Sequence, residues 1–497
     1  MITNPWDKLA KDTKYIVRNF INGQYETCYG DTHIKKYSPR NGFLLYSFGE
    51  GNGKEVDHAV SGARVAFNDG RWKNLPMSQR KTVLQKLANL IEKHSDTFAL
   101  YESLDVGKPI TSVLQDDIPR STFTLRRCAE AADKLLSPSG TDGSYFAYQV
   151  RKPVGIVGAI IGWNFPLSLA VSKVGPALAM GNCLVLKPSE FTSLSANYLA
   201  ALAIEAGIPP GVFNVVNGSG ASVGAALAKH KEIDLLSFVG SSAAGKKMMK
   251  YAGDSNMKRL ILECGGKSPY LVFDDCPPDI DAIAANVVDT AFPNQGALCI
   301  AGTRLLIQES LKDKLLPKII EHTKKIIPQD PLNPDTTFGA LINEAHLKRV
   351  LGYIERGKQE GAELIYGGHC TNTETGGYYI EPAIFDKVKP EHTISQEEIF
   401  GPVLTVSTFT DEDDAIQLAN NTCFGLAAYV ATEHLGRAQR MGQRLNAGSV
   451  IVVGTVTPSG EWINISAEGH RESGFGYEGG QAGLEAYTVS TAVHVLT

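Results

Sequence analysis

Short apolar runs alternate with helical patterns between residues 154 and 263. The five runs read GIVGAII, CLVLK, VFNVV, DLLSFV and RLILE, and each is short enough for a buried parallel strand. Residues 193–206 and 222–229, which lie between them, carry helical patterns. Repeated strand–helix units predict a doubly wound open sheet, whose ligands bind beyond the carboxyl ends of the strands. The same alternation recurs over residues 268–451 and predicts a second core.

The N-terminal region predicts a hairpin and a long helix. Asn22 and Gly23 form a two-residue turn signal between YIVRNF and QYE, which favours a hairpin. Apolar residues at helical spacing predict one helix from about residue 78 to 102, with Ser78 as its N-cap.

Two further patterns lie outside the alternating region. Asp116 and Asp117 precede a helix running toward Ala132, and we interpret them as acids at the positive end of its dipole. Residues 484–496 alternate like a strand, which needs a sheet edge of this chain or of another subunit.

Length and composition predict a large soluble protein. A chain of 497 residues is too long for one core and suggests about three domains. The net charge of −5 provides no basic footprint for nucleic acid. The most apolar stretch, residues 155–171, is interrupted by Asn164 and Pro166, so we expect no membrane partner. Without a signal-peptide pattern, and with eight cysteines at irregular spacing, we expect reduced thiols in the cytoplasm.

A single thiol, Cys299, stands among small residues in the stretch AFPNQGALCIAG. It has no CxxC partner, so it is either an inert buried thiol or a nucleophile. Small neighbours such as Gly296 and Ala301 would let a substrate approach the sulfur. No His, Cys and Asp cluster has the spacing of a metal site.

Two polar residues close predicted strands and suit catalysis. Glu263 follows four largely apolar residues, which would desolvate the carboxylate and raise its pKa toward that of a useful base. The alternative is an ion pair with Lys267. Asn164 has an amide that suits a developing oxyanion, or it simply caps the following helix.

Two other strand ends suit a dinucleotide. The run from Ser237 to Gly245 passes from a strand through a small-residue turn into a helix, which would present free N–H groups to a pyrophosphate. Tight strand–helix packing explains that turn equally well. Lys187 and Glu190 end another strand and suit ribose hydroxyls, and Glu190 would repel a 2′-phosphate and favour NAD over NADP. A turn with solvated charges is the alternative.

Taken together, these stretches resemble the aldehyde dehydrogenase superfamily. In appearance they are closest to the enzymes that oxidise γ-glutamyl-γ-aminobutyraldehyde and related amino-aldehydes. The stretches that carry the resemblance run from Lys152 to Ala428 and are KPVGIVGAIIGWNFP, GNCLVLKPSE, SFVGSSAAG, LECGGKSP, NQGALC, EEIFGPV and NNTCFGLAA.

The resemblance implies an enzyme that oxidises an aldehyde to a carboxylic acid with NAD. Cys299 would be the nucleophile and form a thiohemiacetal and then a thioester. Glu263 would activate the hydrolytic water. Asn164 and the backbone N–H of Cys299 would form the oxyanion hole. Glu478 would lie toward the base and relay protons, and Lys267 would fix the backbone of the base motif.

The resemblance also implies a cofactor site, an architecture and a homo-oligomer. The cofactor-binding residues would be Trp163, Lys187, Glu190, Gly240, Ser241, Glu398 and Phe400. The fold would be α/β, with two doubly wound open-sheet domains and a small β oligomerisation extension. An NAD-binding, Rossmann-like domain would comprise residues 1–125 and 150–265, and the catalytic thiol domain residues 266–455. The bridging segment would comprise residues 126–149 and 478–497, in a homodimer or homotetramer.

The sequence departs from the family in the residues around the substrate. Ala297 replaces the glutamine that commonly stands two residues before the nucleophile. The loop over residues 454–472 is about three residues longer than usual, and Ala467 and Glu468 replace a Phe-Gly pair. Trp462 or Ile463 would rebuild the wall of the aldehyde tunnel.

An amino-aldehyde substrate would need acidic residues near the tunnel mouth. Asp117 matches one acidic position of amino-aldehyde enzymes, while Leu114 occupies the other.

Two alternative functions remain open at this stage. One is a catalytically weakened relative that serves as a binding or structural protein, which Ala297 and the altered loop would motivate. The retention of Asn164, Glu263, Cys299 and Glu398 argues against it. The other is an enzyme that passes its acyl group to CoA. Such relatives usually lack the glutamate at Glu263, so this residue favours a free acid product.

Overall fold

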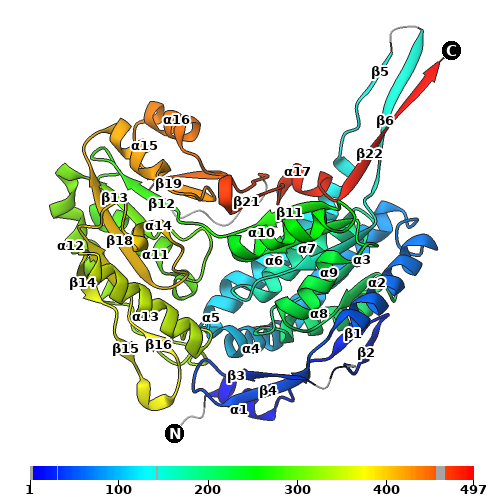
Figure 1. Cartoon of the computed structure of the whole chain (residues 1–497), viewed down its shortest axis with the longest axis horizontal. Coiled ribbons are helices and arrows are strands. Elements are labelled where there is room, and N and C mark those ends of the chain that lie inside the picture. Colours follow the sequence, from blue (N-terminus) through cyan, green and yellow to red (C-terminus); the bar gives the residue numbers. More distant parts are fainter. Residues whose placement is uncertain (1–3, 29, 31, 142–143, 455–464, 497) are drawn as a thin grey trace.

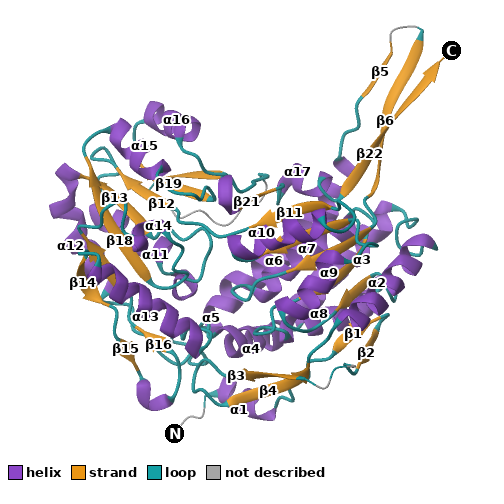
Figure 2. Cartoon of the chain, in the orientation of Figure 1, coloured by secondary structure: helices purple, strands orange, loops and turns teal. Residues whose placement is uncertain are grey.

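Two α/β lobes, each a sheet flanked by helices, make up the body of the protein (Figure 1). The computed structural model describes residues 4–28, 30, 32–141, 144–454 and 465–496. A narrow β extension projects from the first lobe, with the C-terminus near its tip (Figure 2). This arrangement confirms the predicted α/β class with two open sheets and a β extension.

The first lobe is built on an eight-stranded sheet in the order β2-β1-β9-β8-β7-β10-β11-β21. The five central strands are parallel, and the order changes direction between β7 and β10, which is where a doubly wound sheet binds its ligand. All five apolar runs are strands, and the Asn22-Gly23 turn joins β1 to β2 as predicted. The strands are β1 (Asn19–Ile21), β2 (Gln24–Glu26), β7 (Ile156–Ile160), β8 (Cys183–Lys187), β9 (Phe213–Val215), β10 (Leu235–Val239), β11 (Arg259–Glu263) and β21 (Gly474–Phe475).

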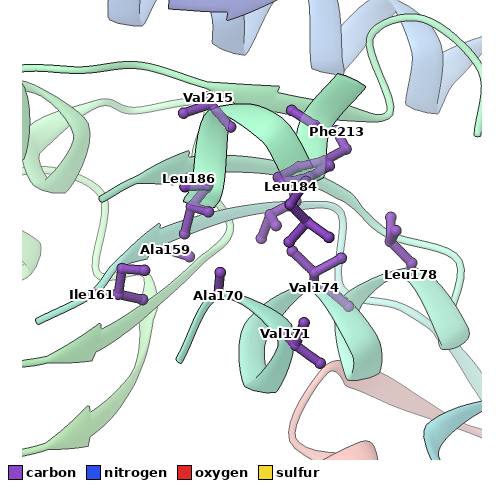
Figure 3. Close-up of a cluster of buried hydrophobic side chains, with 14 of the residues drawn as sticks. Ala159, Ile161, Ala170, Val171, Val174, Leu178, Leu184, Leu186, Phe213 and Val215 are labelled. Carbon is purple, nitrogen blue, oxygen red and sulfur yellow. The ribbon is translucent and has the colours of Figure 1, made fainter. Parts of the chain in front are cut away.

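The helices of the first lobe pack on this sheet, as α7 illustrates. Val174 of α7 lies beside Leu184 of β8 (Figure 3), and Val171, Leu178 and Leu186 belong to the same buried cluster. Since α7 follows β7 directly, it begins at the carboxyl edge of the sheet. The helices are α1 (Pro5–Asp12), α2 (Gly53–Asn68), α3 (Met77–Lys93), α4 (Ser95–Val106), α5 (Ile110–Ser112), η1 (Val113–Asp117), α6 (Ile118–Ala131), η2 (Ala132–Lys134), α7 (Pro166–Ala179), α8 (Leu194–Ala206), η3 (Gly220–Gly224), α9 (Ala225–Lys229) and α10 (Ser242–Gly253).

Two predictions for helices of this lobe are wrong. The segment expected as one helix is two, because His94 leaves helical geometry at φ −106° and ψ 25° between α3 and α4. The N-cap of α3 is Pro76 rather than Ser78, and it makes no side-chain cap. Asp116 and Asp117 do precede the predicted helix, α6 (Ile118–Ala131), but they lie in the π-helix η1 that joins it to α5, so they do not face a free helix N-terminus.

The second lobe is built on a seven-stranded sheet in the order β14-β17-β18-β13-β12-β19-β20. All neighbours are parallel except β14, which is antiparallel to β17. Its strands are β12 (Pro269–Val272), β13 (Arg304–Gln308), β14 (Glu363–Gly367), β17 (Ala383–Asp386), β18 (Val403–Phe409), β19 (Ala427–Ala431) and β20 (Ser449–Val453). Its helices are α11 (Ile280–Ala291), η4 (Pro293–Gly296), η5 (Glu309–Leu311), α12 (Lys312–Thr323), α13 (Glu344–Gln359), η6 (Thr373–Thr375), α14 (Thr393–Gln396), α15 (Glu412–Asn420), α16 (Leu435–Arg444) and η8 (Arg471–Ser473).

The extension is a three-stranded antiparallel sheet of β5 (Ser139–Thr141), β6 (Tyr145–Pro153) and β22 (Thr488–Leu496). The predicted C-terminal strand is therefore present as β22, and it pairs with β6 of the same chain. The pairing runs from Thr488 opposite Pro153 to Leu496 opposite Tyr145. The remaining elements are the hairpin β3 (His33–Tyr37) and β4 (Leu44–Gly49), the pair β15 (Cys370–Thr371) and β16 (Tyr379–Ile380), and α17 (Gly480–Glu485). Within the described ranges, no helix is both long and apolar enough to cross a bilayer.

Candidate active site

The thiol loop, residues 293–302, connects α11 to β13 and carries Cys299. Asn294, Gln295 and Gly296 have φ values of 48°, 57° and 73°, so three successive residues adopt left-handed geometry and turn the chain sharply. A Cβ on Gly296 would lie 2.4 Å from the backbone of Gly401, so only glycine fits there. Cys299 as a whole residue is half-buried.

Asn164 lies against the thiol loop. Its side-chain Nδ2 donates to the carbonyl oxygen of Ala297 at 3.0 Å. In return, Nδ2 of Asn294 donates to the carbonyl oxygen of Asn164 at 2.8 Å. The N-cap of α7 is Phe165, with no side-chain cap, so the alternative role of Asn164 as a helix cap is wrong.

The base loop, residues 263–268, leaves the end of β11 and packs on the thiol loop. A Cβ on Gly266 would lie 2.4 Å from the carbonyl oxygen of Cys299. A Cβ on Gly265 would lie 2.5 Å from Oε2 of Glu398. Gly266 is therefore needed for the close approach of the Glu263 segment to Cys299, and Gly265 for the close approach of Glu398.

Burial raises the pKa of Glu263, and the nearby charge of Lys173 opposes that shift. The alternative ion pair of Glu263 with Lys267 is wrong. Lys267 is buried, its ammonium has no hydrogen-bond partner among the described residues, and the neighbouring charges that act on it are those of Arg304, Glu398 and Glu397. Glu263 thus has the raised pKa expected of a general base.

The Cys299 thiol is protonated at neutral pH in this arrangement. Burial and, after it, the charges of Glu263 and Glu398 together raise its pKa to about 12, against the backbone N–H groups of Ile300 and Cys299. A thiol in this environment needs a base to become a nucleophile, because only the thiolate attacks efficiently.

Lys173 was missed by the sequence analysis. It is fully buried in α7 and forms an ion pair with Glu478. Burial lowers its pKa to about 8, while the charges of Glu263 and Cys299 favour its charged form. The signal was a single lysine inside the apolar run SLAVSKVGPALA, where an unpaired cation would be costly.

The residues expected to hold a nucleotide lie on the same carboxyl edge as Asn164 and Glu263. Lys187, at the end of β8, is buried, and its Nζ lies 3.2 Å from Oε2 of Glu190. Burial lowers the pKa of Lys187, and the charge of Glu190 opposes that shift. The alternative of solvated turn charges therefore fails for Lys187.

The turn after β10 presents a helix N-terminus at this edge. Ser241 is the N-cap of α10, and its hydroxyl accepts a hydrogen bond from the N–H of Ala244 at 3.3 Å. Gly240 donates its N–H to the carbonyl oxygen of Glu263 at 3.0 Å, so this turn and the base are directly linked. The exposed first turn of α10 suits an anion such as pyrophosphate.

Glu398, Phe400 and Trp163 form a second cluster beside the base loop. Oε1 of Glu398 accepts the N–H of Gly266 at 3.0 Å, and burial raises the pKa of Glu398. The rings of Trp163 and Phe400 meet edge to face with centroids 5.2 Å apart. Phe400 adopts left-handed geometry (φ 61°), and Nε2 of His346, which was not predicted, lies 2.7 Å from its carbonyl oxygen.

The segment that departs from the family lies beside Glu478. Ala467 and Glu478 exchange backbone hydrogen bonds of 3.0 and 2.9 Å. The Glu468 side chain turns to accept the N–H of Gly476 at 3.1 Å. Trp462 and Ile463, which we expected to rebuild a wall, lie outside the described residues.

Asp117 does not offer a free carboxylate to a substrate. Its side chain is buried and forms an ion pair with Lys108, whose ammonium also lies 3.6 Å from the centre of the Phe165 ring. The expectation that Asp117 recognises a cationic substrate at the tunnel mouth is therefore wrong. Leu114, at the other position, is half-buried. No group of three or more His, Cys, Asp or Glu within the described ranges is placed to hold a metal ion.

Comparisons with known proteins agree with this geometry. The chain is 44% identical over 484 residues to the NADP/NAD-dependent aldehyde dehydrogenase PuuC of Escherichia coli, which covers 97% of this chain and 96% of that protein. It superposes with a TM-score of 0.97 on an indole-3-acetaldehyde dehydrogenase in complex with NAD+, at 42% identity and with all of both chains covered. It superposes with a TM-score of 0.96 on a γ-glutamyl-γ-aminobutyraldehyde dehydrogenase from Burkholderia cenocepacia, at 41% identity over 99% of each chain. The aldehyde dehydrogenase family model matches residues 26–493, and the chain belongs to this family.

Proposed function

We propose that this protein oxidises an aldehyde to the carboxylic acid with NAD as hydride acceptor. One observation carries the proposal. The Asn164 amide, through its 3.0 Å hydrogen bond to Ala297, and Gly266 of the base loop both contact the segment that carries Cys299. Nucleophile, oxyanion donor and base are thus supplied by segments far apart in the chain that meet in space, which is the requirement for covalent catalysis at a carbonyl.

The residues of NAD binding fit the cofactor. We assign the adenosine ribose to Lys187 and Glu190, the pyrophosphate to Gly240 and Ser241 at the start of α10, and the nicotinamide riboside to Trp163, Glu398 and Phe400. A buried lysine paired with a carboxylate matches two neighbouring ribose hydroxyls, and a helix N-terminus matches a phosphate. When bound, NAD supplies a hydride acceptor.

The proposed reaction begins with loss of the Cys299 proton to Glu263, whose raised pKa makes it a competent acceptor. The thiolate attacks the aldehyde carbon and forms a carbon–sulfur bond. The resulting oxyanion accepts hydrogen bonds from the Asn164 amide and the N–H of Cys299. Loss of hydride from the same carbon restores the carbonyl and leaves a thioester on Cys299.

Hydrolysis then releases the acid. Glu263 takes a proton from the water that attacks the thioester and passes it to the departing sulfur, so that the carbon–sulfur bond breaks and the Cys299 thiol is restored. Before it can do so, Glu263 must release the proton that it took from Cys299. The ion pair of Lys173 and Glu478 provides a route for that proton, because Lys173 interacts with Glu263 on one side and Glu478 on the other. Its lowered pKa, about 8, suits proton exchange near neutral pH.

For the substrate, we propose an aldehyde that carries an amino group at a distance from the carbonyl. The similarity to a γ-glutamyl-γ-aminobutyraldehyde dehydrogenase supports this class. Asp117 provides no support, since it is already paired with Lys108. Asp116, its neighbour in the sequence, is exposed.

We also propose a homo-oligomer in which the β extension contributes to the contact. Phe146 and Leu496 are exposed on this extension by 45% and 83%, and a thin sheet that exposes apolar residues gains from burial against another copy. Light scattering coupled to size exclusion gives the number of copies. The division into domains at residues 125, 150, 265 and 455 likewise stays a proposal. The eight free thiols favour a reducing compartment such as the cytoplasm.

The experiment that tests the function is a measurement of NADH formation with a panel of aldehydes, in the presence and absence of CoA. We expect NADH and free acid without CoA, with higher kcat/KM for γ-glutamyl-γ-aminobutyraldehyde than for indole-3-acetaldehyde. The reverse ranking would contradict the proposed substrate class alone. Correctly folded protein without turnover on any aldehyde would favour a binding protein, and strict dependence on CoA would favour acyl transfer.

A further inference from the structure

A buried carboxylate outside the reaction scheme, Glu102 of α4, holds the start of α7. Its side chain is fully buried, and its Oε1 accepts the N–H of Leu167 at 3.0 Å. Leu167 is the first residue of α7 with a backbone N–H, because Pro166 stands at the start of that helix. The N-cap residue Phe165 makes no side-chain cap, so Glu102 supplies the missing acceptor from another helix.

The same corner carries Asn164, which immediately precedes Phe165. The Asn164 backbone leads into the helix start that Glu102 holds, while its carbonyl and amide bind the thiol loop through Asn294 and Ala297. Asn164 is therefore fixed from two sides. One side is the thiol loop, and the other is the N-terminus of α7.

Two more buried groups contact the start of α7. The ammonium of Lys108 lies 3.6 Å from the centre of the Phe165 ring, and it pairs with Asp117. The backbone carbonyl of Asp117 accepts the Ser168 hydroxyl at 3.3 Å. Phe165, Leu167 and Ser168 at the start of α7 are thus each contacted by a buried group. These groups are Lys108, Glu102 and the backbone carbonyl of Asp117, and no step of the proposed reaction uses them.

Based on these contacts, we propose that Glu102 is a positioning residue for the oxyanion donor Asn164. It acts through the N-terminus of α7 and not by contact with the substrate. The proposal rests on the proposed function, because it concerns the placement of an amide that must meet a developing oxyanion. A displacement of about 1 Å in such a group costs up to about a hundredfold in rate.

A matched control is provided one turn further along α4. Asp105 is buried as deeply, and its Oδ2 accepts the N–H of Leu194 at the start of α8 at 3.3 Å. Asp105 thus accepts the first N–H of α8, which follows the strand that carries Lys187, as Glu102 accepts that of α7. Glu102 also accepts the hydroxyl of Ser195 in α8, and Asp105 accepts that of Tyr46, so Asp105→Ala controls for the loss of a contact to α8 as well. Loss of Asp105 removes a buried carboxylate and a helix cap without touching the Asn164 corner.

The protonation state of Glu102 predicts how three of its substitutions should differ. Burial and the charge of Asp117 raise its pKa to about 8, so at neutral pH it is mostly the uncharged acid, which glutamine imitates. Glu102→Gln keeps an acceptor for Leu167. Glu102→Asp keeps the carboxyl group but withdraws it by one methylene, and Glu102→Ala removes it.

The test measures kcat and both KM values in these variants, after wild-type enzyme has shown NADH production. We expect kcat to fall about tenfold to a hundredfold in Glu102→Ala and Glu102→Asp with KM for NAD within about threefold, and to stay within about threefold in Glu102→Gln. Asp105→Ala is expected to raise KM for NAD with a smaller change in kcat. Equal losses of kcat in Glu102→Ala and Asp105→Ala, or an unchanged kcat in folded Glu102→Ala, would overturn the proposal.

If Glu102→Ala does not fold, the proposal is tested by comparing kcat between Glu102→Asp and Glu102→Gln. A loss in the aspartate variant that the glutamine variant lacks supports positioning, and equal behaviour of the two overturns it. Inactive wild-type enzyme would instead contradict the proposed function, so the two failures are distinguishable.

Discussion

The side-chain nitrogen of Asn164 lies 3.0 Å from the carbonyl oxygen of Ala297, two residues before Cys299. This hydrogen bond uses one of the two amide protons and fixes the plane of the amide. The second proton is left for an oxygen bound at Cys299. The acceptor is the backbone carbonyl oxygen of Ala297. This hydrogen bond therefore does not depend on the glutamine side chain that the family usually has at this position.

Asn164→Ala is expected to lower kcat by about a hundredfold to a thousandfold, since it removes a donor that strengthens as the oxyanion forms. Binding of NAD, measured by quenching of tryptophan fluorescence, is expected to stay within about threefold. Asn294→Ala, which removes the 2.8 Å hydrogen bond to the Asn164 carbonyl and a 3.3 Å hydrogen bond to the Ala297 carbonyl but keeps the Asn164 amide, is the matched control and should lose less. A larger loss in the Asn294 variant would assign the role to the loop and not to the amide.

Glu263→Gln is expected to separate the two halves of the reaction. One NADH per site should form, more slowly than in wild type because Cys299 has also lost its proton acceptor, and turnover should then stall because the thioester lacks its general base. The measurement is a rapid-mixing burst followed by mass spectrometry of the acyl-enzyme on Cys299. Continued turnover at the wild-type rate would show that another group activates the water.

In the free enzyme, Glu263→Gln is expected to make Cys299 more reactive, although it stops turnover. The charge of Glu263 raises the pKa of Cys299, so its removal lowers that pKa and exposes more thiolate at any pH below about 12. Alkylation of Cys299 by iodoacetamide near pH 8 should therefore be a few times faster in Glu263→Gln than in wild type. Glu190→Gln, whose carboxylate is not among the charges acting on Cys299, is the control and should react at the wild-type rate.

Much of this site was predictable because its parts stand at the ends of strands. Short apolar runs gave β7, β8, β10 and β11 directly, and parallel strands bring their carboxyl ends to one edge. Asn164, Lys187, Ser241 and Glu263 all follow such runs. The roles of Cys299, Glu263 and Asn164 came from the family resemblance, since each residue taken alone had a structural explanation.

The parts that escaped prediction are contacts between helices. Glu102 and Leu167 are 65 residues apart, and neither lies in a pattern that indicates a polar contact. Asp117 was misassigned because the π-helix η1 shifts its phase and turns it inward to Lys108. The break at His94 lies within a continuous apolar period, and periodicity alone does not show a local change of φ and ψ.

Glu190→Gln is expected to relax the preference for NAD over NADP. The carboxylate would repel a 2′-phosphate, and it neutralises Lys187 at 3.2 Å, which would otherwise attract that phosphate. We expect kcat/KM for NADP to rise severalfold while that for NAD falls. An unchanged ratio of the two values would place the adenosine ribose away from Glu190.

Lys267→Met is expected to raise the free energy of unfolding at neutral pH, and this gain should decrease as the pH rises. Burial is the first cause that lowers the pKa of Lys267 from 10.5 to about 7, and no described residue accepts a hydrogen bond from its ammonium. Below about pH 7 both the folded and the unfolded chain carry this proton, so the folded state bears the full cost of burying the charge. Between about pH 7 and 10.5 the unfolded chain binds more protons, and the free energy of unfolding of wild type therefore rises with pH.

Methionine fills the same space without a charge, so the advantage of the variant should be on the order of a few kcal/mol near pH 7 and small above about pH 10. The midpoint of the first urea transition, followed from about pH 6 to 10, gives the measurement, because a chain with two lobes need not unfold in one step. Lys247→Met, at an exposed position of α10, is the matched control and should show no such trend. A variant that is less stable at neutral pH would mean that Lys267 contributes more through Glu397 and Glu398 than its burial costs.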